Sequence, residues 1–264
     1  MSDRKIKVEH RDEKYAEKHK SSIWREICNN DNPFIETDVQ VSGFHLQDLV
    51  ENVSYADMVF LMIRSELPTE MQRKLMNSTM VAFAHPGVRS EASRAAILAG
   101  VGKTNASNVL PVGLLVHGGR RKGAGRVDEI MKFLIKNRKK LPSFVLSEEP
   151  EIPCLSAYYG GSDVMASKIC QWLCVDEDVT PSLYWLQSLS EALEVNQCDV
   201  GLNRAAVAAA AFCDLGFMPK YGVALLQLIS GAGIMAQGFE HSNKDATVLP
   251  FVSDKNYHLK DIVR

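Results

Sequence analysis

The amino-acid sequence predicts an almost all-helical (all-α) protein with one short β element near its start. Three observations predict this fold class. From residue 46 onward, apolar side chains recur at helical spacing in one segment after another. Alternation typical of a strand is confined to residues 34–41, and Gly43 ends it. A chain of 264 residues with 46% hydrophobic content can bury a large core, in one large domain or in two unequal ones.

The first predicted helices carry clear start and stop signals. Residues 46–50 open one helix, and Ser54 lies at the N-cap position of the next, whose apolar residues within 58–63 give it a broad buried face. Pro68 sits early in a third helix, where proline is tolerated. That helix is expected to end at residues 85–87, His-Pro-Gly, because proline cannot continue it.

The rest of the chain is also predicted to be mainly helical. The three prolines and the switch from basic to acidic residues within 136–153 indicate a surface connection. The apolar stretch 222–239 is about long enough to span a membrane, but it contains Gln227, Gln237 and four glycines, so we expect a buried core helix. The last 25 residues are expected to be irregular. Further helical segments are expected at 94–99, 109–116, 160–198 (two segments), 205–217 and 220–239.

Composition and charge argue against several classes of function. A formal net charge of −2 gives no whole-molecule reason to bind nucleic acid or an anionic membrane. The N-terminus is charged rather than apolar, so we expect no signal peptide, and residues 1–22 are expected to form a charged arm. The six cysteines form no CxxC pair and have no histidine placed to complete a metal site, which favours reduced thiols in a cytoplasmic protein.

The most informative local pattern is His117-Gly118-Gly119, which closes an apolar run at 109–116. A histidine at such a junction can face a cleft, and the two glycines let a substrate or the backbone come close beside it. We therefore take His117 as the first candidate for a functional side chain.

Five segments have a familiar order and spacing. They are residues 35–49 (IETDVQVSGFHLQDL), 53–68 (VSYADMVFLMIRSELP), 84–88 (AHPGV), 116–119 (VHGG) and 202–217, which runs from Leu-Asn to Asp-Leu-Gly-Phe. Together they resemble the citrate synthase superfamily, in the short bacterial form that includes citryl-CoA lyase-like proteins. The resemblance covers residues from about 23 to 241, and the order of the five segments is what makes it specific.

The resemblance implies a two-domain helical fold. In that family a large domain is formed by both ends of the chain, a smaller helical domain is inserted, and the active site lies between them. By analogy we expect the large domain at 23–125 and 205–264 and the small domain at 126–204. The resemblance also implies an intimate homodimer, with no nucleic-acid or membrane partner.

The resemblance implies chemistry beside a coenzyme A thioester, in which a carbon–carbon bond forms or breaks. A family carboxylate removes a proton from the acyl group, a histidine stabilises the enolate oxygen, a second histidine polarises the acceptor ketone, and arginines hold carboxylates. Carried over residue by residue, His117 is the enolate-stabilising catalytic histidine. His85, in the turn that resembles the family's "DHG", is an expected substrate contact.

Other positions depart from the family pattern. The matched segments place Ala205 at the catalytic carboxylate, Ala157 at the second histidine, and Met165 and Gly231 at arginines. Asp199 could replace the carboxylate only if the local alignment shifts. We therefore expect few positive partners for a di- or tricarboxylate in the cleft, and a degenerate site.

Nearby residues offer partial replacements. Arg120, Arg121 and Lys122 follow the glycines directly; they are either a solvated helix start or a clamp for the phosphates of coenzyme A or for a different acyl group's carboxylate. Placed at a helix N-terminus, three cations would oppose the helix dipole, and a bound anion would relieve them. Tyr158 could donate a hydrogen bond to a carbonyl, and Asn203 of the matched Leu-Asn pair is a further expected substrate contact.

Three functions remain open from the sequence. The first is a citrate synthase-like acyltransferase or lyase that takes an acyl-CoA or related thioester as substrate, holds no tightly bound cofactor and no metal, and uses a non-standard acceptor. The alternative is a catalytically inactive homologue that serves as a dimeric scaffold or metabolite-binding protein. A genuine citrate synthase or citryl-CoA lyase whose motifs are misaligned here is the third possibility.

Overall fold

The computed structural model describes residues 20–195 and 199–257. The predicted charged arm at 1–22 therefore lies almost wholly outside the described residues. The chain divides into two compact units, Met1–Leu67 and Pro68–Arg264, and each is described by itself. This division falls elsewhere than the domain borders expected from the sequence, which stay a prediction.

The first unit is a small antiparallel sheet with two helices. Its described elements are β1 (Trp24–Cys28), β2 (Glu36–Val41), β3 (Phe44–His45), α1 (Leu46–Asn52) and α2 (Tyr55–Arg64), with the strands in the order β1-β2-β3. Val39 and Val41 of β2 pack with Leu49 and Leu61 of the two helices. The sequence located β2 but missed β1, because β1 is largely exposed and lacks a clear apolar alternation.

Local signals fix the turns of this unit. Ser42 and Gly43 have positive φ angles of 49° and 92°, the conformation required by a tight hairpin between β2 and β3. The Ser54 side chain accepts a hydrogen bond from the backbone of Asp57, whose carboxylate accepts one from the Ser54 backbone. This capping box starts α2 where the sequence predicts.

The described part of the second unit is helical apart from turns, loops and a two-stranded pair, β4 (Leu155–Ser156) with β5 (Gly201–Leu202). Short 3-10 turns follow several helices, two of them in the irregular C-terminal segment. The α-helices are α3 (Glu70–Phe83), α4 (Glu91–Val101), α5 (Ala106–His117), α6 (Val127–Asn137), α7 (Pro142–Glu148), α8 (Val164–Leu173), α9 (Pro181–Val195), α10 (Arg204–Asp214) and α11 (Gly222–His241).

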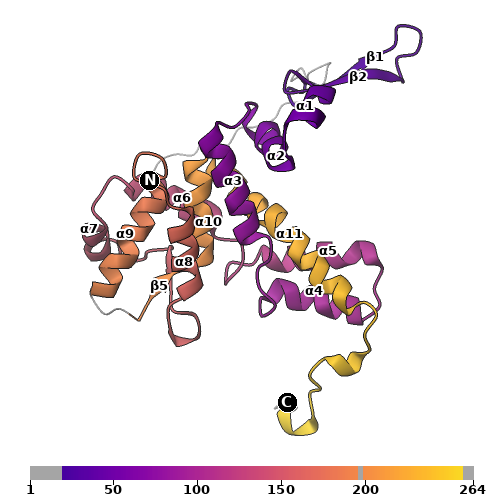
Figure 1. The fold of residues 1–264 in the computed structure, drawn as a ribbon. Helices are drawn as coiled ribbons and strands as arrows, with labels where there is room; N and C mark the ends of the chain where they lie inside the picture. Colours follow the sequence, from indigo (N-terminus) through magenta and orange to yellow (C-terminus); the bar gives the residue numbers. More distant parts are fainter. Residues whose placement is uncertain (1–19, 196–198, 258–264) are drawn as a thin grey trace, which may run out of the picture. The chain divides into compact units, whose positions relative to one another are not determined.

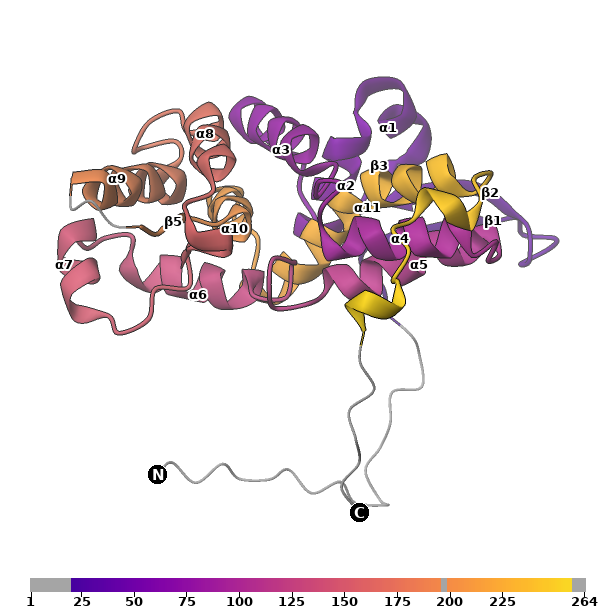
Figure 2. The same ribbon diagram turned by 90° about the horizontal axis from the view of Figure 1, so that it is seen from below.

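The helices of the second unit form two groups, visible in both ribbon views (Figures 1 and 2). In one group α4, α5 and α11 pack together, and in the other α10 packs against α6, α8 and α9. Helix α3 contacts both groups through α10 and α11. Helix α11, which is long and apolar enough to cross a membrane, has one buried face in this packing, as expected for a core helix.

Close approach of helices depends on small residues. A Cβ at Gly238 would lie 2.2 Å from a methyl carbon of Val109, and one at Gly113 would lie 2.2 Å from Ile234. These separations are far below van der Waals contact, so α4, α5 and α11 can pack this closely only around glycine.

Two expectations from the sequence need correction. The stretch 136–153 is no simple surface connection: it contains the end of α6 and the whole of α7, in which Pro142 occupies the first turn, where its missing N–H costs nothing. The basic triplet at 120–122 does not begin a helix, because α6 begins only at Val127. The argument that the triplet opposes a helix dipole is therefore wrong.

Candidate functional site

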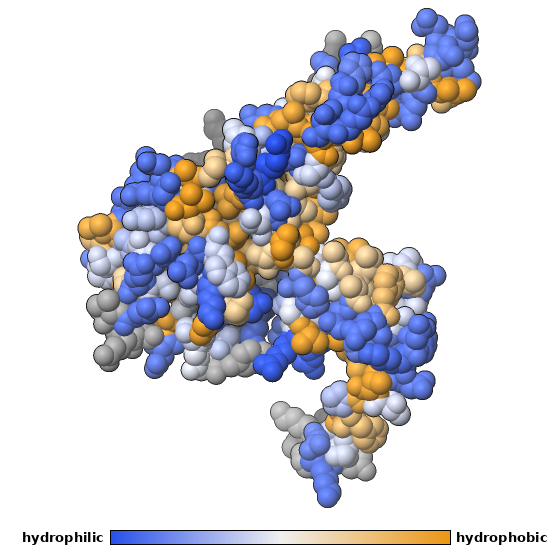
Figure 3. All heavy atoms as spheres, viewed as in Figure 1, coloured by the Kyte–Doolittle hydropathy of each residue, from blue (hydrophilic) through white to orange (hydrophobic). Residues whose placement is uncertain are grey.

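A cleft of about 550 Å³ opens in the second unit where its two helix groups meet. Its walls come from the turn before α4, the loop between α5 and α6, and the starts of α8 and α10. A smaller pocket of about 50 Å³ adjoins it and shares five wall residues with it. Strongly hydrophilic side chains gather between the α8 side and the α4 side of this unit (Figure 3). The shared residues are Pro86, Lys122, Gly123, Arg204 and Ala205.

His117 is the last residue of α5 and lines the smaller pocket. Its side chain is 5% exposed, and its Nε2 atom is buried without a hydrogen-bond partner among the described residues. Burial lowers the pKa of His117, so the imidazole is neutral near pH 7. A neutral imidazole can still donate one hydrogen bond, and a buried polar nitrogen with no protein partner is the arrangement expected of a ligand contact.

The loop after His117 coils tightly against the end of its helix. The Ala124 N–H donates to the His117 carbonyl over 2.7 Å. A Cβ at Gly123 would lie 2.3 Å from that carbonyl oxygen, and one at Gly125 would lie 2.3 Å from the carbonyl oxygen of Gly118. Gln227 of α11 adds a hydrogen bond from its Nε2 to the carbonyl of Leu114 over 2.8 Å. Glycine is therefore required here, and the loop brings its basic side chains to the cleft.

His85 lines the smaller pocket together with His117. The Gly87 N–H donates to its Nδ1 over 2.8 Å, which leaves the proton on Nε2. That Nε2 is 3.2 Å from Oε1 of Gln237 in α11. The His85 ring is thus held in one tautomer, and its N–H is already engaged.

Three helix N-termini face the cleft. Asn203 caps α10, Asp163 caps α8 and Ser90 caps α4, each through a side-chain oxygen that accepts a backbone N–H. All three caps line the cleft. The positive ends of three helix dipoles therefore favour an anion in this space.

Cations line the same cleft, contrary to the expectation of few positive partners. They include Arg89, Arg126 and Arg204, which sequence reasoning missed, together with the predicted Arg120 and Lys122. These three arginines were missed because none of them lies at a position where the family pattern places an arginine. Exposed Arg121, the third predicted cation, lines neither cavity.

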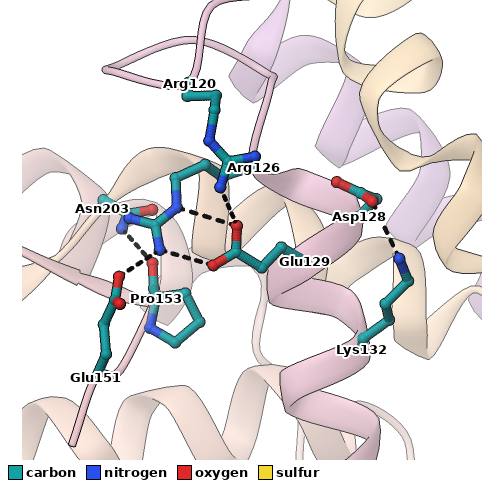
Figure 4. A network of polar contacts seen from close by, with 8 residues as sticks. All are labelled: Arg120, Arg126, Asp128, Glu129, Lys132, Glu151, Pro153 and Asn203. Atoms are coloured by element: carbon teal, nitrogen blue, oxygen red, sulfur yellow. Dashed lines mark hydrogen bonds and ion pairs between the residues drawn. The ribbon is translucent and has the colours of Figure 1, made fainter. Parts of the chain in front are cut away.

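Arg126 and Arg120 belong to a network on one wall (Figure 4). Arg126 donates to Glu129 and to Glu151, both over 2.8 Å, and Arg120 donates to Glu129 over 2.6 Å. The hydrogen bond from Arg126 lowers the pKa of Glu129 and keeps this carboxylate ionised. These two arginines are partly neutralised by their partners, so they offer a ligand less than their formal charge.

Two further predicted residues lie at the cleft wall. Tyr158 lies beneath Lys122, whose Nζ is 5.3 Å from the ring centroid, and its hydroxyl accepts a long 3.4 Å hydrogen bond from the Lys122 N–H. Asn203 donates from Nδ2 to the carbonyl of Pro153 over 2.9 Å and accepts at Oδ1 from the Ala206 N–H over 2.8 Å. Each atom of its amide thus makes one hydrogen bond within the protein, which fits a positioning role better than direct contact.

The four positions at which the sequence departs from the family pattern do not all lie at the cavities. Ala205 lines both cavities and Met165 lines the cleft. Ala157 is exposed and lines neither, while Gly231 faces Leu110 of α5. That these four positions have lost functional side chains stays a prediction from the sequence.

Carboxylates are scarce around His117. Among the described residues, none lines the smaller pocket. Glu91 and Asp163 line the larger cleft, and Asp163 bonds Arg204. Asp199 is exposed and lines neither cavity. Within residues 20–195 and 199–257, no three His, Cys, Asp or Glu side chains gather in a way that could hold a metal ion.

No model of a known protein family matches this sequence, and no curated protein matches it. Solved structures do match its fold. Citryl-CoA lyase from Hydrogenobacter thermophilus has a TM-score of 0.72 at 19% identity, covering 93% of this chain and 96% of its own. ATP citrate lyase from Methanosaeta concilii, solved with (3S)-citryl-CoA, has a TM-score of 0.68 at 14% identity, covering 92% of this chain and 43% of its own.

Citrate synthase from Thermoplasma acidophilum, in a ternary complex with carboxymethyl coenzyme A and oxaloacetate, has a TM-score of 0.60 at 13% identity, covering 81% of this chain and 59% of its own. The chain thus has a citrate synthase-like, mostly helical fold, as its sequence motifs predict. At these identities the likeness establishes the fold, and function is argued from the site.

Proposed function

We propose that this protein is a citrate synthase-like enzyme that binds an acyl-CoA or related thioester and promotes enolate-type formation or cleavage of a carbon–carbon bond, with a non-standard acceptor. The single observation that carries the proposal is that His117, whose buried Nε2 has no hydrogen-bond partner among the described residues, lines a pocket that adjoins a cationic cleft. A neutral imidazole N–H, set in place before the reaction and shielded from water, would stabilise the enolate oxygen that forms beside a thioester.

The cleft suits the rest of such a ligand. Its volume of about 550 Å³ lies within the range of small-molecule sites, and its cations and helix N-termini would attract phosphates. Lys122 and Arg120 border it and are our candidates for contacts to coenzyme A; Arg121, next to them, would act only from the rim. His85, Tyr158 and Asn203 would shape the wall on the acceptor side.

We also propose that the protein forms a cytoplasmic homodimer. Helices α4, α5 and α11 carry large apolar side chains that are more than a third exposed, as expected of an interaction surface. A second copy of the same chain is the occupant that the resemblance implies. The exposed apolar residues are Leu98 of α4, Val112, Leu115 and Val116 of α5, and Leu228, Met235 and Phe239 of α11.

Hydrogen exchange into the substrate tests the enzyme most directly. Acetyl-CoA and propionyl-CoA are incubated with the protein in D2O, and deuterium at the carbon beside the thioester is measured by mass spectrometry. We expect exchange with the wild type and at least a 100-fold slower exchange with His117→Ala, since removing one preorganised donor costs on the order of 10²- to 10³-fold. His45→Ala, an exposed histidine of the first unit, is the matched control and should exchange normally.

The alternative function is a catalytically inactive homologue that binds a metabolite or acts as a dimeric scaffold. The absence of a carboxylate from the His117 pocket, among the described residues, favours it. It predicts that coenzyme A thioesters raise the melting temperature while no deuterium enters the substrate. If neither a melting shift nor exchange occurs with any thioester, the proposed enzyme activity is wrong.

A further inference from the structure

Arg204 lies at the junction of the two cavities and lines both of them. It is the first residue of α10, directly after the cap Asn203 and directly before Ala205. A cation at the first position of a helix opposes the helix dipole, so helix stability gives no reason for an arginine here. None of the family motifs that the chain matches has an arginine at this position either. We therefore look for a functional reason for Arg204.

The guanidinium is held on one side only. Its Nε donates to Oδ2 of Asp163 over 3.0 Å, and Oδ1 of Asp163 accepts the N–H groups of Met165 and Ala166 at the start of α8. The two terminal amino groups of Arg204 donate no hydrogen bond to any residue in the part of the chain that the structure describes. Its Nη1 lies beside Gly87, 4.0 Å from where a Cβ would be. Asp163 thus orients the guanidinium of Arg204, whose terminal amino groups remain as donors for a ligand.

A second, independent observation points to a ligand at the same place. His117, 5% exposed, lines the pocket that Arg204 also lines, and its buried Nε2 has no hydrogen-bond partner among the described residues. The pocket of about 50 Å³ has room for a few non-hydrogen atoms. The neutral imidazole of His117 suits a carbonyl oxygen, and the guanidinium of Arg204 suits a carboxylate. Because the pocket is small, these two ligand groups would be only a few bonds apart.

We propose that Arg204 binds the carboxylate of a carboxylated acyl thioester, a half-thioester of a short dicarboxylic acid, whose thioester carbonyl accepts a hydrogen bond from His117. This inference rests on the proposed function for the thioester, and it adds the acyl group's class. Arg89 and the start of α4 line the adjoining larger cleft, where they add positive potential next to this subsite. Arg89 forms no ion pair with any residue among 20–195 and 199–257.

Malonyl-CoA and propionyl-CoA test this inference, because their acyl groups have the same number of carbons and differ in whether the last carbon is a carboxylate or a methyl group. Their affinities are measured by isothermal titration calorimetry for the wild type, Arg204→Gln, Arg204→Lys and Arg94→Gln, an exposed arginine of α4 that lines neither cavity. We expect the wild type and Arg94→Gln to prefer malonyl-CoA by about 10- to 100-fold, the size of a charge-assisted hydrogen bond. Arg204→Gln should lose the preference and keep its affinity for propionyl-CoA, and Arg204→Lys should fall between.

Binding of sodium malonate, measured in the same way, distinguishes failure of this inference from failure of the proposed function. Equal affinity of the wild type for the two thioesters, or an unchanged preference in Arg204→Gln, would overturn the role of Arg204 and leave thioester binding intact. If no thioester binds but malonate binds in an Arg204-dependent way, the subsite stands and the thioester function fails. If malonate binding is also independent of Arg204, both are wrong. Circular dichroism and melting of each variant exclude unfolding as the cause.

Discussion

Arg204 and Asp163 join the starts of two helices through a hydrogen bond of 3.0 Å between Nε and Oδ2. One carboxylate thereby caps α8 and orients the guanidinium that begins α10, at the edge of the pocket around His117. Asp163 engages only the Nε of Arg204, so the two terminal amino groups of the guanidinium remain as donors toward the cavity.

The first prediction concerns Asp163→Asn. Asparagine caps a helix about as well as aspartate, so the free energy of unfolding should change by less than about 0.5 kcal/mol. The negative charge that orients Arg204 is lost, so the preference for malonyl-CoA over propionyl-CoA should fall about 3- to 10-fold, less than in Arg204→Gln. Calorimetry measures the preference, and urea denaturation measures the stability.

Asp163→Ala provides the contrast, because it removes the cap as well. It should cost about 1 kcal/mol of stability in addition to the loss of preference. Asp163 acts through Arg204 in this scheme, so a full preference in Asp163→Asn would show that the fork is oriented by something else.

The second prediction is a pH dependence of stability. Burial lowers the pKa of His117 in the native state, whereas an unfolded chain has an imidazole pKa of about 6.5. Below that pH the unfolded chain binds more protons than the native one, so the contribution of His117 makes the free energy of unfolding fall as pH drops from about 6.5 toward the native pKa. Above pH 6.5 both states are neutral there and the contribution vanishes.

His117→Asn removes this titration. Urea denaturation between pH 4.5 and 8 should give a shallower loss of stability on the acid side for the variant than for the wild type, and parallel curves above pH 7. Adding a ligand that accepts a hydrogen bond from the neutral imidazole should still leave the wild type with the steeper loss of stability on the acid side. Superimposable slopes for the two proteins across the acid range would contradict the buried, neutral state of His117.

The third prediction concerns the loop that follows His117. In Gly125→Ala the new Cβ would lie 2.3 Å from the Gly118 carbonyl oxygen, which is backbone and cannot move aside cheaply. We expect a loss of about 1–3 kcal/mol of stability and weaker thioester binding, because the loop carries Arg120 and Lys122. Gly161→Ala is the control: nothing lies within 4 Å of its Cβ, and its stability should stay within about 0.5 kcal/mol of the wild type. Equal stability of the two variants would contradict the tight coil.

Sequence reasoning recovered the fold class because helical periodicity and caps are local. The capping box at Ser54 and the helix around 109–116 are recognisable from neighbouring residues alone, even though Pro111 lies inside that helix. Strand β1 was missed because its role depends on pairing with β2, and its own side chains are mostly exposed. Helix α7 was missed because its prolines suggested a loop.

The candidate site was only partly predictable for a similar reason. His117 and His85 lie in turns with distinctive short motifs, and both line one pocket. Arg204 and Arg89 lie outside those motifs, and only the tertiary fold brings them together, with Arg204 at the start of one helix and Arg89 just before another. A cation at the first position after a helix cap was the available signal, since it opposes the dipole and needs a compensating partner.

The last prediction tests the proposed homodimer. Leu115 is 79% exposed at the end of α5, beside the exposed Val112 and Val116. If a second copy covers this face, Leu115→Glu places a charge in an apolar interface and should shift the protein from dimer to monomer in analytical ultracentrifugation at micromolar concentration. Leu141→Glu, 73% exposed just before α7, is the matched control and should leave the association state unchanged. If both variants sediment as the wild type does, the interface lies elsewhere; a monomeric wild type would overturn the homodimer itself.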